Sequence, residues 1–168
     1  GDDREVPYGK SIGGRTYEET LSEVDRAVDM NAKKVKLKIS PSNSDQILKA
    51  LREIRGRYSD IELMVDANGT FDPSNANHIN VLKQLDQQGL LMIEEPVSRV
   101  GEVKGINAVR MLKGKIPEFD TAICLDDCLS DKETTLRALD EDLCDVVNIK
   151  PGRIGSIVSA INLAYLCK

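Results

Sequence analysis

The sequence contains no tryptophan and few aromatic residues of any kind. Phe, Trp and Tyr make up only 4% of the 168 residues, and scattered basic residues leave a net charge of -5. Surfaces that bind nucleic acid combine a basic patch with aromatic side chains on which bases stack. The composition therefore argues against a nucleic-acid partner, and the negative charge argues against an anionic membrane surface.

Long apolar runs and a targeting segment are also lacking. No hydrophobic stretch approaches the roughly 20 residues that span a bilayer, and residues 1–5 are polar and acidic, unlike a signal peptide. We therefore expect a cytoplasmic protein without membrane contact. The remaining composition, 40% hydrophobic and 30% charged, is typical of a globular domain with a sizeable core.

The four cysteines form no C-x-x-C pair, and the single histidine, His78, lies far from them in the sequence. Structural zinc sites need four Cys or His ligands at short, characteristic spacings. This pattern argues against a zinc site. We expect the cysteines to be reduced and mostly buried thiols, as in a cytosolic protein: Cys124, Cys128, Cys144 and Cys167.

Short apolar strands alternate with amphipathic helices along the whole chain. Thr16 opens the first helix with a capping box, a second helix follows a loop over 40–44, and Asp72-Pro73 is expected to start the third. Six alternations predict a parallel sheet with helices packed outside it, an α/β fold. The expected strands are 6–12, 34–39, 61–66, 90–94, 122–126 and 144–149, and later helices are expected around 106–112, over 132–139 and from about Ile154.

Two parallel architectures fit this alternation, a doubly wound open sheet and a (β/α)8 TIM-type barrel. An open sheet binds its ligand at one switch point and uses two or three strand ends, whereas a barrel gathers all strand ends around one axis. No G-x-G-x-x-G motif follows the first strand to favour a dinucleotide fold. We therefore predict that residues 1–168 form one partial barrel domain of about six βα units. Polar residues end five of the strands: Lys38, Asp66, Glu94, Asp126 and Lys150.

Three of these strand-end residues are acids on consecutive strands: Asp66, Glu94 and Asp126. A carboxylate at the tip of a buried strand must be paired or bound to a cation. Capping of the next helix, or pairing with nearby lysines, is the alternative role. Three acids together favour convergence on one hard divalent cation, and an all-oxygen site suits Mg2+, with Mn2+ also fitting.

The two strand-end lysines, Lys38 and Lys150, belong to strands on opposite sides of a barrel, so their amines can face each other across the metal. A lysine acts as a general base only when its pKa falls from about 10.4 towards neutrality. A divalent cation, a second ammonium group and partial burial all lower it. Lys36 shares a strand face with Lys34 and Lys38. For Lys36, a solvated or carboxylate-paired position is one role, and positioning a ligand or tuning Lys38 is the other. Together these groups suit removal of a proton α to a metal-bound carboxylate, with the metal stabilising the enediolate.

Other polar residues adjoin these positions in the sequence. Asn68, Glu95 and Asp127 follow the acids closely. Their side chains are expected either to point away from these acids or to contact the metal ligands rather than the metal. Asp127 is expected to pair with Lys150 on the next strand. For Arg153, pairing with an acid at a helix start and binding a ligand are both open.

Five motifs, in this order, resemble the enolase superfamily in its muconate-lactonising subgroup. The last is most similar to the o-succinylbenzoate synthases of menaquinone biosynthesis and the related N-acylamino acid racemases. The resemblance implies a small carboxylate substrate, Mg2+ held by the three strand-end acids, and acid/base roles for Lys38 and Lys150. The motifs are 36–38 (KLK), 66–68 (DAN), 93–96 (IEEP), 124–127 (CLDD) and 147–155 (VNIKPGRIG).

For a synthase, the resemblance implies a metal-dependent carbon–oxygen lyase. Lys38 removes the α proton and then assists loss of the hydroxyl group, while Lys150 stabilises the intermediate by its charge. For a racemase or a dipeptide epimerase, the two lysines work from opposite faces. The chain departs from the family at Asp127, where Glu is usual, and at Ser156, where Gly is usual.

The family also has a capping domain and two further barrel strands that these 168 residues lack. We therefore expect the chain to be the central part of a longer enzyme. The hypothesis of a different class is an inactive barrel fragment that self-associates as a homo-oligomer, because a partial barrel has two unpaired sheet edges.

Overall fold

The computed structural model describes residues 8–13 and 16–167. Strands and helices alternate along the described part of the chain. The expected start of the first strand, at residues 6 and 7, lies outside these ranges. The elements are β1 (Gly9–Ile12), α1 (Tyr17–Asp29), β2 (Lys34–Lys38), α2 (Ser44–Arg57), β3 (Glu62–Asp66), α3 (Ala76–Asp86), β4 (Met92–Glu94), α4 (Ile106–Lys115), β5 (Ile123–Leu125), α5 (Lys132–Asp140), β6 (Val146–Val147), α6 (Pro151–Ile154) and α7 (Ile157–Leu166).

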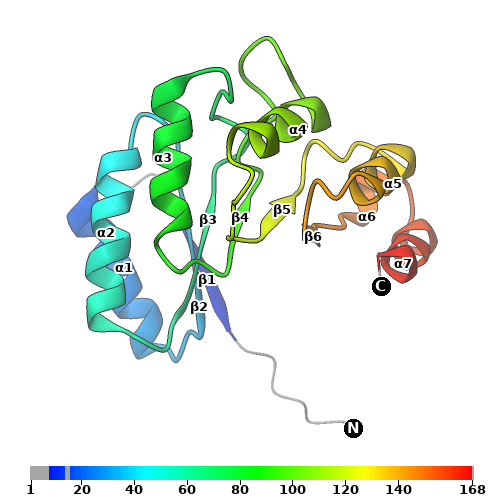
Figure 1. Ribbon diagram of the computed structural model, residues 1–168. Coiled ribbons are helices and arrows are strands. Elements are labelled where there is room, and N and C mark those ends of the chain that lie inside the picture. The colour runs from blue at the N-terminus through cyan, green and yellow to red at the C-terminus, as the bar shows by residue number, and fades with distance from the viewer. Residues whose placement is uncertain (1–7, 14–15, 168) are drawn as a thin grey trace, which may run out of the picture.

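The six strands form one parallel sheet in the order β1-β2-β3-β4-β5-β6. A doubly wound sheet reverses its strand order at a switch point, and this sheet has no such reversal. Figure 1 shows helices α1 to α5 following one another around the outside of the strands. The structure is thus part of a TIM barrel, which confirms the prediction of fold class.

The alternation in β2 explains how one strand serves both the core and the barrel interior. Val35 and Leu37 are fully buried and belong to the same apolar cluster as Val24 of α1 and Leu51 of α2. The lysines of Lys34–Lys38 occupy the opposite, partly exposed face. Successive side chains of a strand point to opposite faces, so burying the valine and leucine under the helices turns the lysine amines inward.

The capping box predicted at the start of α1 is present. Thr16 accepts a hydrogen bond from the backbone N–H of Glu19 at 3.3 Å, and the Glu19 carboxylate accepts one from the backbone N–H of Thr16 at 2.9 Å. These contacts satisfy two backbone donors that the helix itself leaves unpaired.

The predicted start of the third helix at Asp72-Pro73 is wrong. Asp72 accepts hydrogen bonds from the backbone N–H and the hydroxyl of Ser74, which closes a turn before the helix. Asn75 is the N-cap of α3 instead and accepts from the N–H groups of Asn77 and His78. Asp and Asn are both strong capping residues, but the Asp72 carboxylate is already engaged by Ser74, and Asn75 is the residue that caps the helix.

The last helix is also divided where one continuous helix was expected from Ile154. Gly155 has a φ of +94°, a conformation that separates α6 from α7 and that glycine adopts without steric cost. Ser156 then caps α7 by accepting from the N–H of Ser159. Strand β6 is shorter than the predicted range 144–149 and covers only Val146–Val147.

All four cysteines are free thiols, as predicted. Cys124 and Cys144 are buried, Cys128 is half-buried and Cys167 is exposed. Burial raises the pKa of Cys124 to about 12 and that of Cys144 to about 11. Within the described ranges, no helix combines the length and the apolar character that a membrane crossing needs.

Candidate metal and acid–base site

The predicted site residues form a row along the carboxyl ends of neighbouring strands. In the sheet register Lys38 of β2 lies opposite Asp66 of β3, and Asp66 lies opposite Glu94 of β4. Asp126 directly follows β5, and Lys150 follows β6 at the start of α6. Parallel pairing of consecutive strands therefore places residues that are far apart in the sequence in one row. The residues at its two ends, Lys38 and Lys150, are 112 positions apart (150 − 38).

The three acids of the row are buried. Asp66 is 3% exposed, and Glu94 and Asp126 are each 4% exposed. A buried carboxylate is costly unless it is paired, and each has a lysine partner. Nζ of Lys38 lies 2.5 Å from Oδ2 of Asp66, Nζ of Lys36 lies 2.6 Å from Oε2 of Glu94, and Nζ of Lys150 lies 2.5 Å from Oδ2 of Asp126. Pairing with lysines, the alternative role considered from the sequence, is thus present.

The amine of Lys36 lies between Asp66 and Glu94, the first two acids of the row. Its Nζ lies 2.6 Å from Oε2 of Glu94 and 3.5 Å from Oδ2 of Asp66, so one ammonium bridges two acids. Burial lowers the pKa of Lys36, but the hydrogen bond and the charge of Glu94, followed by those of Asp66, outweigh burial and raise it overall. Lys36 is therefore held in its charged form between two proposed ligands, a more central place than the sequence indicated.

Asn68 contacts both members of the Lys38–Asp66 pair. Its Oδ1 accepts a hydrogen bond from Nζ of Lys38 at 2.9 Å, and its backbone N–H donates to Oδ1 of Asp66 at 3.0 Å. Its φ is +46°, in the left-handed region that asparagine tolerates better than most residues. Asn68 thus contacts Asp66, one of the proposed metal ligands.

At the other end of the row, Arg153 binds both neighbouring acids. One of its terminal nitrogens lies 3.0 Å from Oδ1 of Asp126, and the other lies 2.6 Å from Oδ1 of Asp127. Burial raises the pKa of Asp126, but hydrogen bonds from Lys150 and Arg153 outweigh burial and lower it overall.

The expected ion pair of Asp127 with Lys150 is present but long, and Arg153 is the nearer partner of Asp127. Oδ1 of Asp127 is 3.9 Å from the Lys150 amine, but only 2.6 Å from Arg153, while Lys150 binds Asp126 closely. The α6 turn brings the planar guanidinium group against both acids at once, a geometry that arginine supports and lysine does not. Pairing with an acid, one of the two roles considered for Arg153, is thus present.

The local sequence pattern predicted no role for Asn148. Its Nδ2 donates to Oε1 of Glu94 at 3.1 Å, from the neighbourhood of β6. Asn148 lies two residues before Lys150, a spacing that places both on the same face of an extended strand. From this spacing, the sequence could have predicted that Asn148 faces the row.

The single histidine has a structural role outside this row. Nδ1 of His78 accepts a hydrogen bond from the backbone N–H of Asp72 at 2.9 Å, and its ring packs edge-on against Phe71. These contacts join the turn before α3 to the helix itself.

The residues of the row fit a hard divalent cation in the chemistry of their donor atoms. Within the described ranges, no group of three or more His, Cys, Asp or Glu side chains has the arrangement of a metal site, and lysine amines contact the carboxylate oxygens. One buried oxygen, Oδ1 of Asp126, has only the ion pair with Arg153 at 3.0 Å and accepts no hydrogen bond of good geometry. Carboxylate oxygens on adjacent strand ends are the donors that Mg2+ and Mn2+ prefer.

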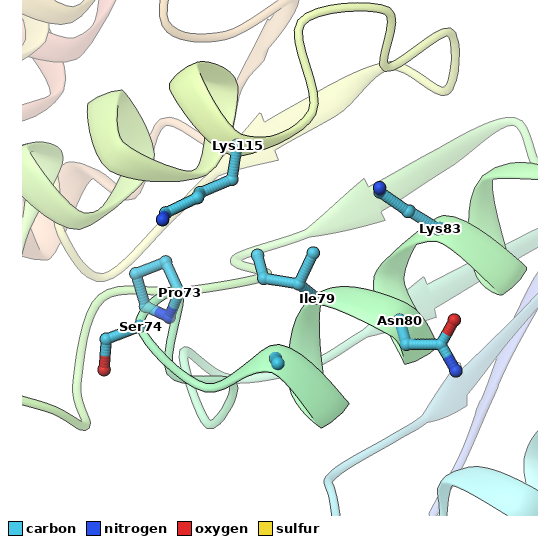
Figure 2. Close-up of a pocket in the computed structure, with 7 residues that line it drawn as sticks. Pro73, Ser74, Ile79, Asn80, Lys83 and Lys115 are labelled. Atoms are coloured by element: carbon cyan, nitrogen blue, oxygen red, sulfur yellow. The ribbon is translucent and has the colours of Figure 1, made fainter.

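A cavity of about 390 Å³ lies elsewhere, between α3 and α4 on the outer helical surface. Figure 2 shows Lys115 at the end of α4 reaching towards Pro73 and Ser74. None of the predicted site residues lines this cavity, so it is separate from the row. Its lining residues are Pro73, Ser74, Ala76, Ile79, Asn80, Lys83 and Lys115.

A (β/α) barrel with buried acids and paired lysines at the carboxyl ends of its strands defines the class of protein, because barrel enzymes place their chemistry at that end. Comparison with known families agrees with this class. Residues 19–168 match the family described as enolase C-terminal domain-like, and the chain belongs to that family of the enolase superfamily.

The chain is similar to proteins of two activities. It is 32% identical to the o-succinylbenzoate synthase of Bacillus subtilis (strain 168) over 163 residues, which cover 97% of this chain and 40% of that protein. It is 33% identical to the synthase of Geobacillus stearothermophilus over 165 residues, covering 98% and 40%. It is 31% identical to the N-succinylamino acid racemase of an Amycolatopsis species over 163 residues, covering 96% and 41%.

A solved structure supports the same relationship. An enolase-superfamily member from Listeria innocua Clip11262 is 32% identical and superposes with a TM-score of 0.79, covering 96% of this chain and 40% of that one. The chain therefore spans about 40% of the length of the relatives it matches.

Proposed function

We propose that this chain is the catalytic barrel portion of a Mg2+-dependent o-succinylbenzoate synthase. The observation that carries the proposal is the unbroken row of strand-end groups, three buried acids between two lysines, each lysine within 2.5 Å of the acid next to it. The similarity to several o-succinylbenzoate synthases over nearly the whole chain supports this activity over others of the superfamily.

Asp66, Glu94 and Asp126 would hold the cation in this proposal. A bound Mg2+ supplies positive charge that makes the carbon next to a substrate carboxylate more acidic. Lys36 and Asn148 contact Glu94 from two sides and orient its carboxylate. Asn68 and Arg153 do the same for Asp66 and Asp126, and Asp127 anchors Arg153 in turn. Outer contacts of this kind set the orientation of metal ligands.

Lys38 is the proposed base and acid of the dehydration. Its amine takes the α proton as the C–H bond breaks, and the released electron pair is held on the substrate carboxylate in a negatively charged intermediate. That electron pair then forms a C=C bond as the C–O bond to the hydroxyl group breaks. The same amine returns the proton to the departing hydroxyl, which leaves as water, so the reaction needs no external oxidant or reductant. Lys150, from the far end of the row, stabilises the negative charge of the intermediate.

A second candidate is racemisation of an N-acylamino acid. The observation that favours it is the placement of Lys38 and Lys150 at opposite ends of the row, on β2 and after β6, because a racemase needs one base on each face of the substrate. Similarity to N-succinylamino acid racemases at 31% and 32% identity supports it. A dipeptide epimerase would use the same pair of lysines.

The deciding experiment is an assay of the natural protein that contains this chain, using the cyclohexadiene precursor of o-succinylbenzoate with and without Mg2+. Metal-dependent formation of the aromatic product is the expected result. A folded, metal-binding protein that forms no product, but exchanges the α proton of an N-succinylamino acid in heavy water, would favour the racemase. A protein that neither binds Mg2+ nor turns over either substrate would contradict both and leave the inactive, self-associating fragment.

A further inference from the structure

Glu95 is a buried acid that has no lysine or arginine partner among the described residues. It is only 1% exposed, and its carboxylate accepts three hydrogen bonds. The neighbouring acids Asp66, Glu94 and Asp126 each have a cationic partner. Burying a charge without a partner of opposite charge is energetically expensive. Hydrogen bonds must offset this cost for Glu95, and their donors therefore identify the segments that Glu95 holds.

Two of these bonds fix the loop that carries Asp126. Oε2 of Glu95 accepts from the backbone N–H of Asp126 at 2.7 Å, and Oε1 accepts from the backbone N–H of Cys128 at 2.9 Å. The carboxylate thus binds both sides of the turn that follows β5. Hydrogen bonds to an ionised carboxylate are about twice as strong as those between neutral groups. This contact therefore fixes the backbone position of Asp126, from which its side chain extends.

The backbone of Glu95 joins the other two strand ends. Its carbonyl oxygen accepts from the N–H of Gly69 at 2.7 Å, in the loop after Asp66, and its own N–H donates to the carbonyl of Cys124 at 2.8 Å. Glu95 directly follows Glu94 in the chain. One residue therefore contacts the loops after β3 and β5 and is covalently joined to the last residue of β4.

The backbone conformation of Glu95 is energetically unfavourable. Glu95 has a φ of +44°, a left-handed conformation that is unfavourable for residues other than glycine and asparagine. Strained backbone of this kind persists only where surrounding contacts over-determine it, and it concentrates at functional sites.

A glycine makes room for the third hydrogen bond. The hydroxyl of Ser98 donates to Oε1 of Glu95 at 2.5 Å. A Cβ at Gly69 would collide with that hydroxyl and lie 2.7 Å from Cγ of Arg99, and the φ of Gly69 is +68°. The loop after β3 can therefore pack against Ser98 only because residue 69 is glycine.

We propose that Glu95 is a positioning residue that holds the three strand ends bearing Asp66, Glu94 and Asp126 in the relative arrangement that a divalent cation needs. The proposal rests on the proposed function, because it takes these acids as the metal ligands. Glu95 itself touches neither the cation nor the substrate. Its effect passes through the backbone of Gly69, Cys124 and Asp126.

Glu95→Gln tests the proposal with little change in volume. Oε1 has two donors and Oε2 has one, so a glutamine keeps its oxygen towards Ser98 and Cys128 and turns its NH2 group towards the N–H of Asp126. Two donors then face each other, and the Asp126 loop is released. We expect the dissociation constant for Mn2+, read by electron paramagnetic resonance on the natural protein, to rise at least about tenfold, as for other outer partners of metal ligands.

A control variant separates positioning from a simple change of charge. Glu102→Gln removes one exposed negative charge from the same segment and leaves all contacts of the Glu95 carboxylate in place. This variant should bind Mn2+ as the unchanged protein does. Equal weakening in Glu102→Gln and Glu95→Gln, or undiminished binding in Glu95→Gln, would overturn the proposal. Failure of the unchanged protein to bind Mn2+ would instead overturn the proposed metal site.

Hydrogen exchange tests the same contacts without any substitution, so it does not depend on whether Glu95→Gln folds. The amides of Asp126 and Cys128 donate to a buried carboxylate and should exchange slowly in the natural protein without metal, when followed by nuclear magnetic resonance. Exchange of both amides at the rate of an exposed loop would show that the Glu95 contact does not hold the loop, and would refute its positioning role.

Discussion

The amine of Lys36 lies 2.6 Å from Oε2 of Glu94, and this contact places a positive charge at the centre of a buried acidic row. The Lys36 side chain is 25% exposed and that of Glu94 only 5%. Asp66, 3.5 Å from the same amine, shares the charge. Without the ammonium, two buried carboxylates on adjacent strands would repel each other across the register pair Asp66–Glu94.

Lys36→Met should therefore destabilise the protein. We expect the free energy of unfolding to fall by about 2 kcal/mol, because removing one partner of a buried pair leaves an uncompensated charge. Chemical denaturation with and without Mg2+ measures this. A divalent cation that binds the same acids should recover part of the loss.

The matched control is Lys34→Met, on the same strand and the same face. Lys34 pairs with Glu62 at 2.7 Å, but both side chains are at least 40% exposed. An exposed pair of this kind contributes about 0.5 kcal/mol or less. If the two variants lose the same stability, Lys36 does not have the compensating role inferred from its position.

Lys38→Ala should abolish turnover without weakening metal binding. Removal of a positioned general base lowers kcat by about 100-fold to 10,000-fold. The amine of Lys38 contacts Asp66 at 2.5 Å, so its loss removes a competitor for that carboxylate rather than a ligand. Steady-state kinetics and a Mg2+ titration on the same preparation test both parts. Near-normal kcat would exclude Lys38 as the base, whatever the metal affinity.

Asp66→Asn separates the metal proposal from the lysine proposal. The amide keeps the shape of the carboxylate but loses the charge that binds the cation, so the dissociation constant for Mg2+ should rise by more than the about 10–100-fold that follows loss of an outer partner. Titration calorimetry measures it, with Asp60→Asn, an exposed acid-to-amide change, as the control. An unchanged dissociation constant would show that Asp66 of β3 does not bind the cation.

Local sequence patterns predicted the strands and the row well, and the reason is physical. The alternation in β2 and the acids at the ends of β3, β4 and β5 follow from a period of two residues and from burial, which act within a few residues. Where two local choices were equally good, the prediction failed. Asp72 and Asn75 are both capable N-caps, and only the packed structure selects Asn75.

The partners of the long side chains were harder to predict. Lysine and arginine have several rotatable bonds, and their choice among nearby acids depends on contacts between segments far apart in the chain. Arg153 reaches Asp127 from the short helix α6, across 26 positions of the chain. The buried carboxylate of Glu95, which binds backbone N–H groups more than 30 positions away in the chain, left no periodic pattern in the sequence.

Tyr58 allows a test of the fold that is independent of the proposed activity. Its hydroxyl donates to Oδ1 of Asp25 at 2.8 Å, which joins the end of α2 to α1. The hydrogen bond to Asp25 raises the pKa of Tyr58, burial and the charge of Asp25 add to this, and the charge of Arg57 opposes it. The folded pKa therefore lies above the unfolded value of about 10.

Because the folded pKa is the higher one, the contact stabilises the protein fully below about pH 10 and loses its effect as the pH rises through the folded value. Absorbance at 295 nm, with Tyr58→Phe subtracted to remove the other tyrosines, should show Tyr58 ionising above its usual range. Asp25→Ala should return the pKa towards that range, whereas Asp25→Asn, which keeps an acceptor oxygen, should return it only partly. A Tyr58 titration that is identical in all three backgrounds would show that α1 and α2 are not joined by this bond.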